Sequence, residues 1–218
     1  MLAVSGAGDV SVSEEDGREN ELTSALVLLC LVRLVHILST NALTHQAPSP
    51  MESSIILTLQ RLLGSETGRV LVGFCARWAI YGLIPFALIA RQSRVMRHAV
   101  SEAMWTALLA FTLSTLLATL IGRVRPYLAI AGAQAFVPPN IQAGSFPSSH
   151  TAVAIGVASA LAFTNVPVGV AAFLIALLVA FGRIAAGMHY PTDVLGGAII
   201  GVLAFTIVRL THAALARI

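Results

Sequence analysis

Six apolar stretches, each about as long as the hydrocarbon core of a bilayer is thick, follow one another through most of this chain. A helix needs about 20 mainly apolar residues to cross that core, with a range of roughly 17–25. Of the 218 residues 57% are hydrophobic and 11% are charged, whereas soluble domains carry about 25% charged residues. The sequence therefore predicts an all-α fold, an integral membrane bundle of six transmembrane helices. The predicted spans are residues 22–39, 70–90, 99–121, 149–164, 167–185 and 194–212.

Two segments fall outside this pattern. Residues 1–21 hold six of the ten acidic residues and a single base, Arg18. A signal peptide begins with basic residues and has a short apolar centre, so we predict instead a disordered cytoplasmic tail, followed by one membrane domain over 22–218. Residues 51–64 are apolar on one face and too short to span, which predicts an interfacial or re-entrant helix.

The arginines set the expected orientation. All 13 basic residues are arginine, and the densest group is Arg91, Arg94 and Arg97. Loops rich in basic residues stay in the cytoplasm, so counting spans from this loop places both termini inside. The connections at 40–69, 122–148 and 186–193 are then outside. No basic stripe with interleaved aromatic residues indicates a nucleic-acid partner, and the sequence leaves the oligomeric state open.

Three polar islands interrupt the apolar second half, at residues 122–126, 146–150 and 182–193. Each lies at the edge of a predicted span, and the predicted topology brings all three to the same outer face. An unpaired charge beside lipid is costly. The cations, the two imidazoles and the one carboxylate in this position are therefore expected to act together. We interpret them as one composite site for a phosphorylated lipid.

The third island contains Arg183, His189 and Asp193. Pro191 suits the first turn of a helix, which places Asp193 where the helix dipole favours a negative charge. A carboxylate four residues after a histidine can hold one ring N–H and leave the other nitrogen as a nucleophile. For His189 alone, the alternative is an interfacial side chain that anchors the helix to headgroups.

The other two islands supply anion-binding groups. Ser148, Ser149 and His150 begin the fourth span, where free backbone N–H groups and the dipole favour an anion and His150 can supply a proton. The alternative is an ordinary helix cap. Arg125 carries the planar guanidinium suited to phosphate oxygens, and its alternative, which also holds for Arg123, is an arginine that reaches toward headgroups.

In order and spacing, the islands resemble the three motifs of the type 2 phosphatidic acid phosphatase (PAP2) superfamily, which also includes vanadium haloperoxidases. The family pattern is Lys-x6-Arg-Pro, then Pro-Ser-Gly-His, then Ser-Arg-x5-His-x3-Asp. The corresponding residues are Ala118-x6-Arg125-Pro126, Pro147-Ser148-Ser149-His150 and Gly182-Arg183-x5-His189-x3-Asp193. The resemblance covers residues 118–201, and it implies a PAP2-like helical core.

The resemblance implies a phosphatase that uses no metal and no other cofactor. His189 is expected to attack phosphorus and form a phosphohistidine, Asp193 to orient His189, and His150 to protonate the leaving oxygen. Phosphoryl oxygens are expected to be held by Arg125, Arg183, Ser148 and the amide of Ser149, with Arg123 as an accessory group.

Three positions depart from the family pattern. Ser149 replaces a glycine, and Gly182 replaces a serine. Ala118 replaces the motif lysine, and no lysine occurs elsewhere in the chain. Two interpretations stay open: an arginine (Arg123, Arg33 or Arg77) substitutes, or the site is weakened or inactive.

Within the superfamily, the motif surroundings are most similar to bacterial undecaprenyl-diphosphatases. This implies hydrolysis of a polyprenyl diphosphate to the monophosphate, which recycles the lipid carrier of cell-wall synthesis at the outer face of the bacterial plasma membrane. The alternatives are a phosphatidate or phosphatidylglycerophosphate phosphatase, and a catalytically inactive lipid-binding relative. A vanadate-dependent haloperoxidase is disfavoured because that chemistry does not need six spans.

Some side chains within the spans have no assigned role in these motifs. Arg33 and His36 share one helix face and either line a headgroup pocket or bond to each other, and Arg77 is expected to need a partner. Cys30 and Cys75 are interpreted as thiols buried in lipid. Gly197-x3-Gly201 is interpreted as a close helix–helix contact.

Overall fold

The computed structural model describes residues 48–84, 87, 94–138 and 144–216, together with 29 and 33. The predicted tail, nearly all of the first span, Cys30 and His36 lie outside these residues. Residues 1–42 and 43–218 form separate compact units, and the description below concerns the second. Every regular element described is helical, which confirms the all-α prediction.

The helix expected near residues 51–64 is α2, Pro50–Leu62. Its start is a capping box: the Ser49 hydroxyl accepts from the Glu52 N–H at 3.2 Å, and the Glu52 carboxylate accepts from the Ser49 N–H at 3.4 Å. This pair satisfies two of the backbone donors that a helix start leaves open. The box also fixes Glu52 in a buried position, where it can reach beyond its own helix.

The span expected at 70–90 is divided. α3 covers Glu66–Arg77 and is capped by Ser65, and a 3-10 turn, η1, follows over Ala79–Gly82. Gly82 is a weak helix former, and the turn tightens where it lies. The continuous span predicted over residues 70–90 is therefore interrupted after Arg77, although the apolar character of the segment is retained.

The remaining predicted spans each correspond to a helix. They are α5 (Arg94–Ile121), α7 (Ser149–Thr164), α8 (Val166–Ala185) and α9 (Pro191–Leu215), with the short α6 (Pro126–Ala129) following α5. Prolines occupy the first turns of α6, α8 and α9, where the missing N–H removes no helical hydrogen bond. Among the described residues, three segments are long and apolar enough to cross a membrane: Met96–Ala129, α8 and α9; α7 is apolar but shorter.

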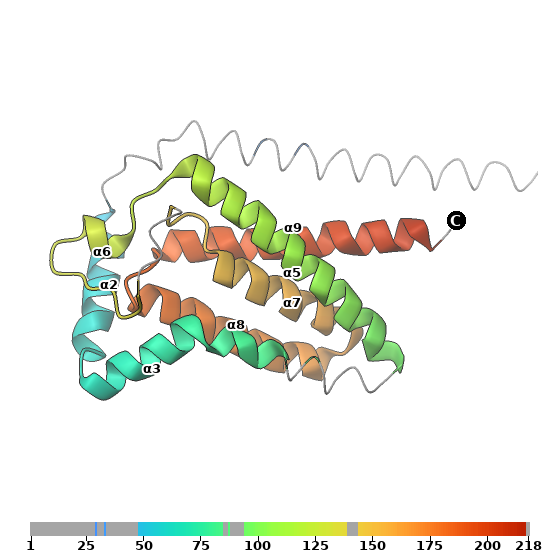
Figure 1. Cartoon of the computed structure of the whole chain (residues 1–218), viewed down its shortest axis with the longest axis horizontal. Helices are drawn as coiled ribbons and strands as arrows, with labels where there is room; N and C mark the ends of the chain where they lie inside the picture. The colour runs from blue at the N-terminus through green and yellow to red at the C-terminus, as the bar shows by residue number, and fades with distance from the viewer. Residues whose placement is uncertain are drawn as a thin grey trace, which may run out of the picture. The chain divides into compact units, whose positions relative to one another are not determined.

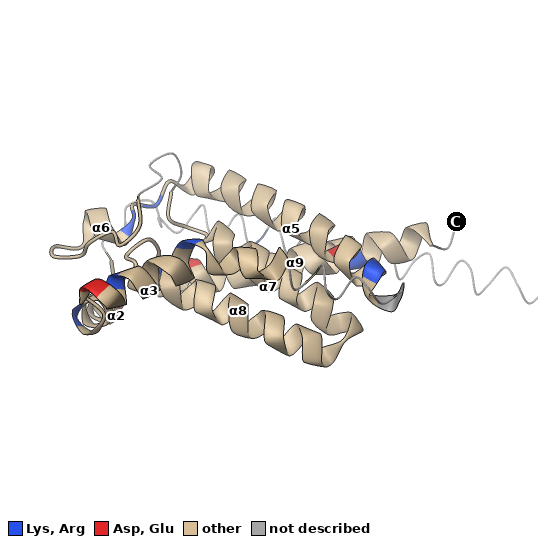
Figure 2. Ribbon diagram, turned by 60° about the horizontal axis from the view of Figure 1, so that its bottom comes forward, with Lys and Arg blue, Asp and Glu red and all other residues tan. Residues whose placement is uncertain are grey.

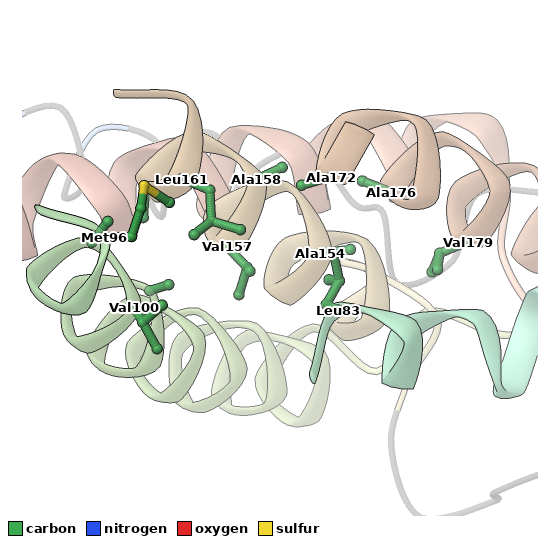
Figure 3. Close-up of a cluster of buried hydrophobic side chains, with 13 residues drawn as sticks. Leu83, Met96, Val100, Ala154, Val157, Ala158, Leu161, Ala172, Ala176 and Val179 are labelled. Carbon is green, nitrogen blue, oxygen red and sulfur yellow. The ribbon is translucent and has the colours of Figure 1, made fainter. Parts of the chain in front are cut away.

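The helices pack side by side, with α7 against α5, α8 and α9, and α3 against α8 (Figure 1). Small side chains allow this close packing, as the alanines of α7 and α8 in the core cluster show (Figure 3). A Cβ on Gly197 would lie 2.5 Å from the Ser148 carbonyl oxygen, and one on Gly201 would lie 2.4 Å from that of Ala152. The two glycines therefore bring α9 close to α7, as predicted.

Charged residues of the unit gather at its two ends, with a long uncharged middle (Figure 2). Large apolar side chains along the middle, among them Leu108, Phe111 and Leu174, are exposed, as expected for a surface that faces lipid. Arg77 is also exposed and stacks over Trp78 at 5.6 Å. At the end remote from the polar islands, the buried Glu102 accepts from Arg209 at 2.8 Å, and this pair ties α5 to α9.

Candidate functional site

The three polar islands meet at one end of the bundle, where α5 and α8 finish and α7 and α9 begin (Figure 1). His189 reaches this end through a tight turn after α8. Gly187 has a φ of +70°, a conformation that other residues adopt only with strain. The backbone N–H groups of Met188 and His189 then donate to the Arg183 carbonyl at 3.1 and 3.2 Å. The turn folds His189 back over the end of α8.

The partners of the His189 ring define its tautomer. Nδ1 lies 2.6 Å from the Ser145 carbonyl oxygen, and Nε2 lies 3.0 Å from Nη2 of Arg183. A carbonyl can only accept and a guanidinium can only donate. The proton therefore resides on Nδ1, and the lone pair of Nε2 faces Arg183. The Asp193 carboxylate is farther from Nδ1, at 3.7 Å, so the carbonyl of Ser145 is the nearer orienting group.

His189 is kept in its neutral form at neutral pH. Burial, and after it the positive charge of Arg183, lower the pKa of the imidazole to about 4, although the Asp193 carboxylate acts in the opposite direction. A neutral imidazole with an oriented lone pair is the form that a nucleophile requires.

Arg183 is a buried cation with a free donor. Its Nη1 donates to the Ala76 carbonyl at 3.3 Å, while its Nε–H is buried and has no hydrogen-bond partner among the described residues. Such orphaned donors are rare, and a phosphoryl oxygen beside Nε2 of His189 would satisfy this one. Gly182 permits the arrangement, since a Cβ there would lie 2.6 Å from the Ala76 nitrogen. This close contact between α3 and α8 accounts for a glycine where the family has serine.

The start of α7 completes the anion-binding end. Ser148 caps the helix: its hydroxyl accepts from the Thr151 hydroxyl at 3.0 Å. The cap interpretation thus holds for Ser148, whose own proton stays available to an anion. His150 lies in the first turn, close enough to interact electrostatically with Arg183, His189 and Arg125. Arg125 approaches from the start of α6, where Nη1 donates to the Met188 carbonyl at 3.3 Å.

Asp193 is completely buried and both of its carboxylate oxygens are bonded. Oδ2 accepts from the Tyr190 N–H at 2.8 Å, and Oδ1 accepts from Nη1 of Arg123 at 2.6 Å. Nη2 of Arg123 approaches Glu52 of α2 at 3.3 Å. Arg123, predicted as an accessory phosphate group, is therefore directed to two carboxylates. Sequence reasoning did not include Glu52 in the site; the capping box locates Glu52 on its helix but says nothing of a partner 71 positions away.

Position 118 is enclosed by neighbouring backbone. Ala118 is buried, and its carbonyl accepts from the N–H groups of Gly122 and Gly144 at 3.0 and 3.2 Å. The segment after Gly144 is tied down further, with the Ser145 N–H donating to the Arg123 carbonyl at 2.8 Å. Of the other candidate arginines, Arg77 is exposed and Arg33 belongs to the other unit.

An apolar groove of about 700 Å³ runs from this end along the bundle. Its walls come from η1 and the residues after it, from α5 and from α7, and include Ala103, Ala107 and Val153. Ser149 and His150 form its polar end. A long apolar chain in the groove would therefore have its head beside the imidazole of His150.

The sequence pattern of the PAP2 superfamily matches residues 99–217, more than half of the chain. The chain belongs to this superfamily, whose phosphatases hydrolyse lipid phosphates, and its long apolar helices make it a membrane member.

Individual relatives agree with this assignment. Undecaprenyl-diphosphatase BcrC of Bacillus subtilis (strain 168) is 30% identical over 132 residues, which are 60% of this chain and 67% of that protein. Bacitracin transport permease protein BcrC of Bacillus licheniformis is 29% identical over 101 residues, covering 44% of this chain and 49% of that one. The crystal structure of Aquifex aeolicus LpxE superimposes with a TM-score of 0.51 at 25% identity, over 81% of this chain and 93% of that one.

Proposed function

We propose that this protein hydrolyses a polyprenyl diphosphate, of the undecaprenyl type, to the monophosphate through a phosphohistidine intermediate. The observation that carries the proposal is the contact of Nε2 of His189 with Arg183, beside an apolar groove that ends at His150. It joins an oriented nucleophile, a phosphate-binding cation and a channel for a lipid tail. The similarity to an undecaprenyl-diphosphatase supports the choice of substrate.

The proposed reaction has two steps. Arg183 transfers its hydrogen bonds from Nε2 to phosphoryl oxygens, Nε2 forms a bond to the terminal phosphorus, and the bond from phosphorus to the bridging oxygen breaks. His150 donates its proton to that leaving oxygen. Water then attacks phosphorus, His150 takes up the water's proton, and the bond between Nε2 and phosphorus breaks to release inorganic phosphate.

Metal independence belongs to the proposal. Arg125 and Arg183 are buried, and guanidinium groups in a site with little water stabilise the charge of a phosphoryl group strongly. The N–H groups at the start of α7 add to this. The motif lysine has no replacement at position 118, so the two arginines carry the cationic part of the phosphate site.

A substrate panel tests the function. Purified protein in detergent with EDTA is expected to release phosphate from a polyprenyl diphosphate faster than from phosphatidylglycerophosphate or phosphatidate. Faster release from either glycerophospholipid would overturn the substrate assignment. Binding of these lipids without any phosphate release would identify a catalytically inactive relative, the outcome that the alanine at position 118 favours.

The groove gives a prediction on chain length. Ala107→Trp is expected to fill part of it and lower kcat/KM for a long-chain polyprenyl diphosphate about tenfold, because each methylene group kept out of the groove forfeits about 0.8 kcal/mol. A short, water-soluble prenyl diphosphate should be hydrolysed as before. Leu116→Trp, at an exposed position of the same helix outside the groove, is the control. An equal loss for both substrates would show that the groove does not hold the tail.

We further propose that the site faces the outside of a bacterial plasma membrane, with both termini cytoplasmic. The basic residues Arg94 and Arg97 begin α5 at the end remote from the site, in agreement with the preference of basic residues for the cytoplasm. A cysteine introduced at residue 135 is expected to react with an impermeant reagent on intact cells, and one at residue 95 only after lysis. The reverse pattern would place the site inside.

A further inference from the structure

The buried side chains of Glu52 and Arg123 and the exposed Thr192 form a junction beside Asp193. Nη1 of Arg123 donates to Thr192 Oγ1 at 2.7 Å as well as to Asp193, and the Thr192 hydroxyl donates to Glu52 Oε1 at 2.6 Å. The guanidinium also lies over the Tyr190 ring, 4.0 Å from its centroid. Three segments distant in sequence, α2, the residues after α5 and the start of α9, thus meet at the Arg123 guanidinium.

This junction holds the Asp193 carboxylate in one orientation. With Oδ1 bonded to Arg123 and Oδ2 bonded to the Tyr190 N–H, neither oxygen can turn without losing a buried hydrogen bond. Oδ2 is thereby kept 3.7 Å from Nδ1 of His189. The same residues also tie α2 to the start of α9, so the helix that lies outside the bundle core contributes to the site.

We propose that Arg123 and Glu52 are positioning residues of the phosphatase: Glu52 and Thr192 orient the Arg123 guanidinium, and Arg123 holds Asp193 in register with His189. The inference rests on the proposed function. It assigns Arg123 to the carboxylate rather than to the phosphate, and so excludes it as a substitute for the motif lysine. Two carboxylates share this guanidinium, so its positive charge is already compensated; only its Nε–H has no hydrogen-bond partner among the described residues.

A double-mutant cycle tests this assignment. Arg123→Gln is expected to lower kcat about 10–100-fold and to change KM less than about threefold, because it removes no substrate contact. In an Asp193→Asn background, the same change should lower kcat less than about threefold, since residues that act through one another are not additive. An equal loss in both backgrounds, or a rise in KM as the main effect, would assign Arg123 to the substrate and overturn the proposal.

The pH profile supplies a second readout. His189 is surrounded by Arg183 of α8, Asp193 of α9, Arg125 beside α6 and His150 of α7. Without Arg123 the negative charge of Asp193 acts on the His189 imidazole with no compensating cation beside it, so the imidazole binds a proton more readily. The acid limb of kcat/KM, set in the wild type by the His189 pKa of about 4, is expected to move to higher pH. An unmoved limb would contradict the proposal.

Controls separate this inference from the proposed function. Wild type and His189→Gln are assayed together, and their contrast alone decides whether the protein is a phosphatase. Arg209→Gln breaks an Arg–Glu pair at the other end of the bundle, and it is expected to change neither kcat nor the acid limb. Should Arg123→Gln unfold in detergent, Glu52→Gln keeps the side-chain shape. Glu52→Gln is expected to lower kcat about tenfold in the wild type, but not in the Asp193→Asn background. If Glu52→Gln lowered kcat by the same factor in both backgrounds, the proposal would be refuted.

Discussion

Replacement of His189 by glutamine is expected to lower kcat at least about ten-thousandfold while the protein remains folded. The loss is large because the substitution removes the nitrogen that forms the bond to phosphorus, and no other described nucleophile is oriented toward Arg183 in the same way. The glutamine side-chain amide can still donate to the Ser145 carbonyl, which His189 reaches at 2.6 Å. Phosphate release from a polyprenyl diphosphate measures the effect.

A second assay separates loss of the nucleophile from loss of binding. Wild type quenched in acetonitrile and base during turnover is expected to carry acid-labile phosphate on histidine, and His189→Gln is expected to carry none. His212→Gln, in the last turn of α9 at the far end of the bundle, is the matched histidine control and should retain wild-type turnover. Retained turnover in His189→Gln would refute the mechanism.

The helix positions, and the location of all three polar islands at the same end of the bundle, follow from the sequence because they depend on local signals. Apolar run length predicted α8 and α9 within a few residues. Proline in the first turn of α9 correctly predicted where Asp193 lies relative to the helix start. Successive islands are separated by an even number of crossings, none between the first two and two (α7 and α8) between the second and third, so their convergence at one end required no knowledge of packing.

Contacts that join distant segments could not be predicted in this way. The sequence suggested that Asp193 alone orients His189, whereas the nearer acceptor is the backbone carbonyl of Ser145, a group that every residue has. Glu52 reaches Arg123 across 71 positions, and a capping glutamate looks the same whether or not it has a tertiary partner.

Two departures from the family pattern have different structural consequences. Glycine at 182 allows the backbones of α3 and α8 to approach closely, which places the Ala76 carbonyl within reach of Arg183. Alanine at 118 is buried beneath the segment that begins at Gly144. The change at position 182 therefore supports the position of the Arg183 guanidinium, whereas the change at position 118 removes a cation and adds none.

Arg183 is therefore expected to be the most sensitive phosphate-binding position. Arg183→Lys should lower kcat about 10²–10³-fold, because an ammonium retains the charge but lacks the planar fork of separate nitrogens that can bond to the Ala76 carbonyl and to phosphoryl oxygens in fixed directions. Its stability should fall less than that of Arg183→Ala, which leaves the Ala76 carbonyl without this donor.

The pH profile distinguishes the two roles of Arg183. Its charge helps to lower the pKa of His189, so Arg183→Ala is expected to shift the acid limb of kcat/KM to higher pH, whereas Arg183→Lys should leave the limb in place. Arg209→Lys, the same exchange at the remote ion pair, is expected to keep wild-type kcat. If Arg183→Lys retained wild-type kcat, charge alone would suffice, and the fork geometry of the guanidinium would have no part in transition-state binding.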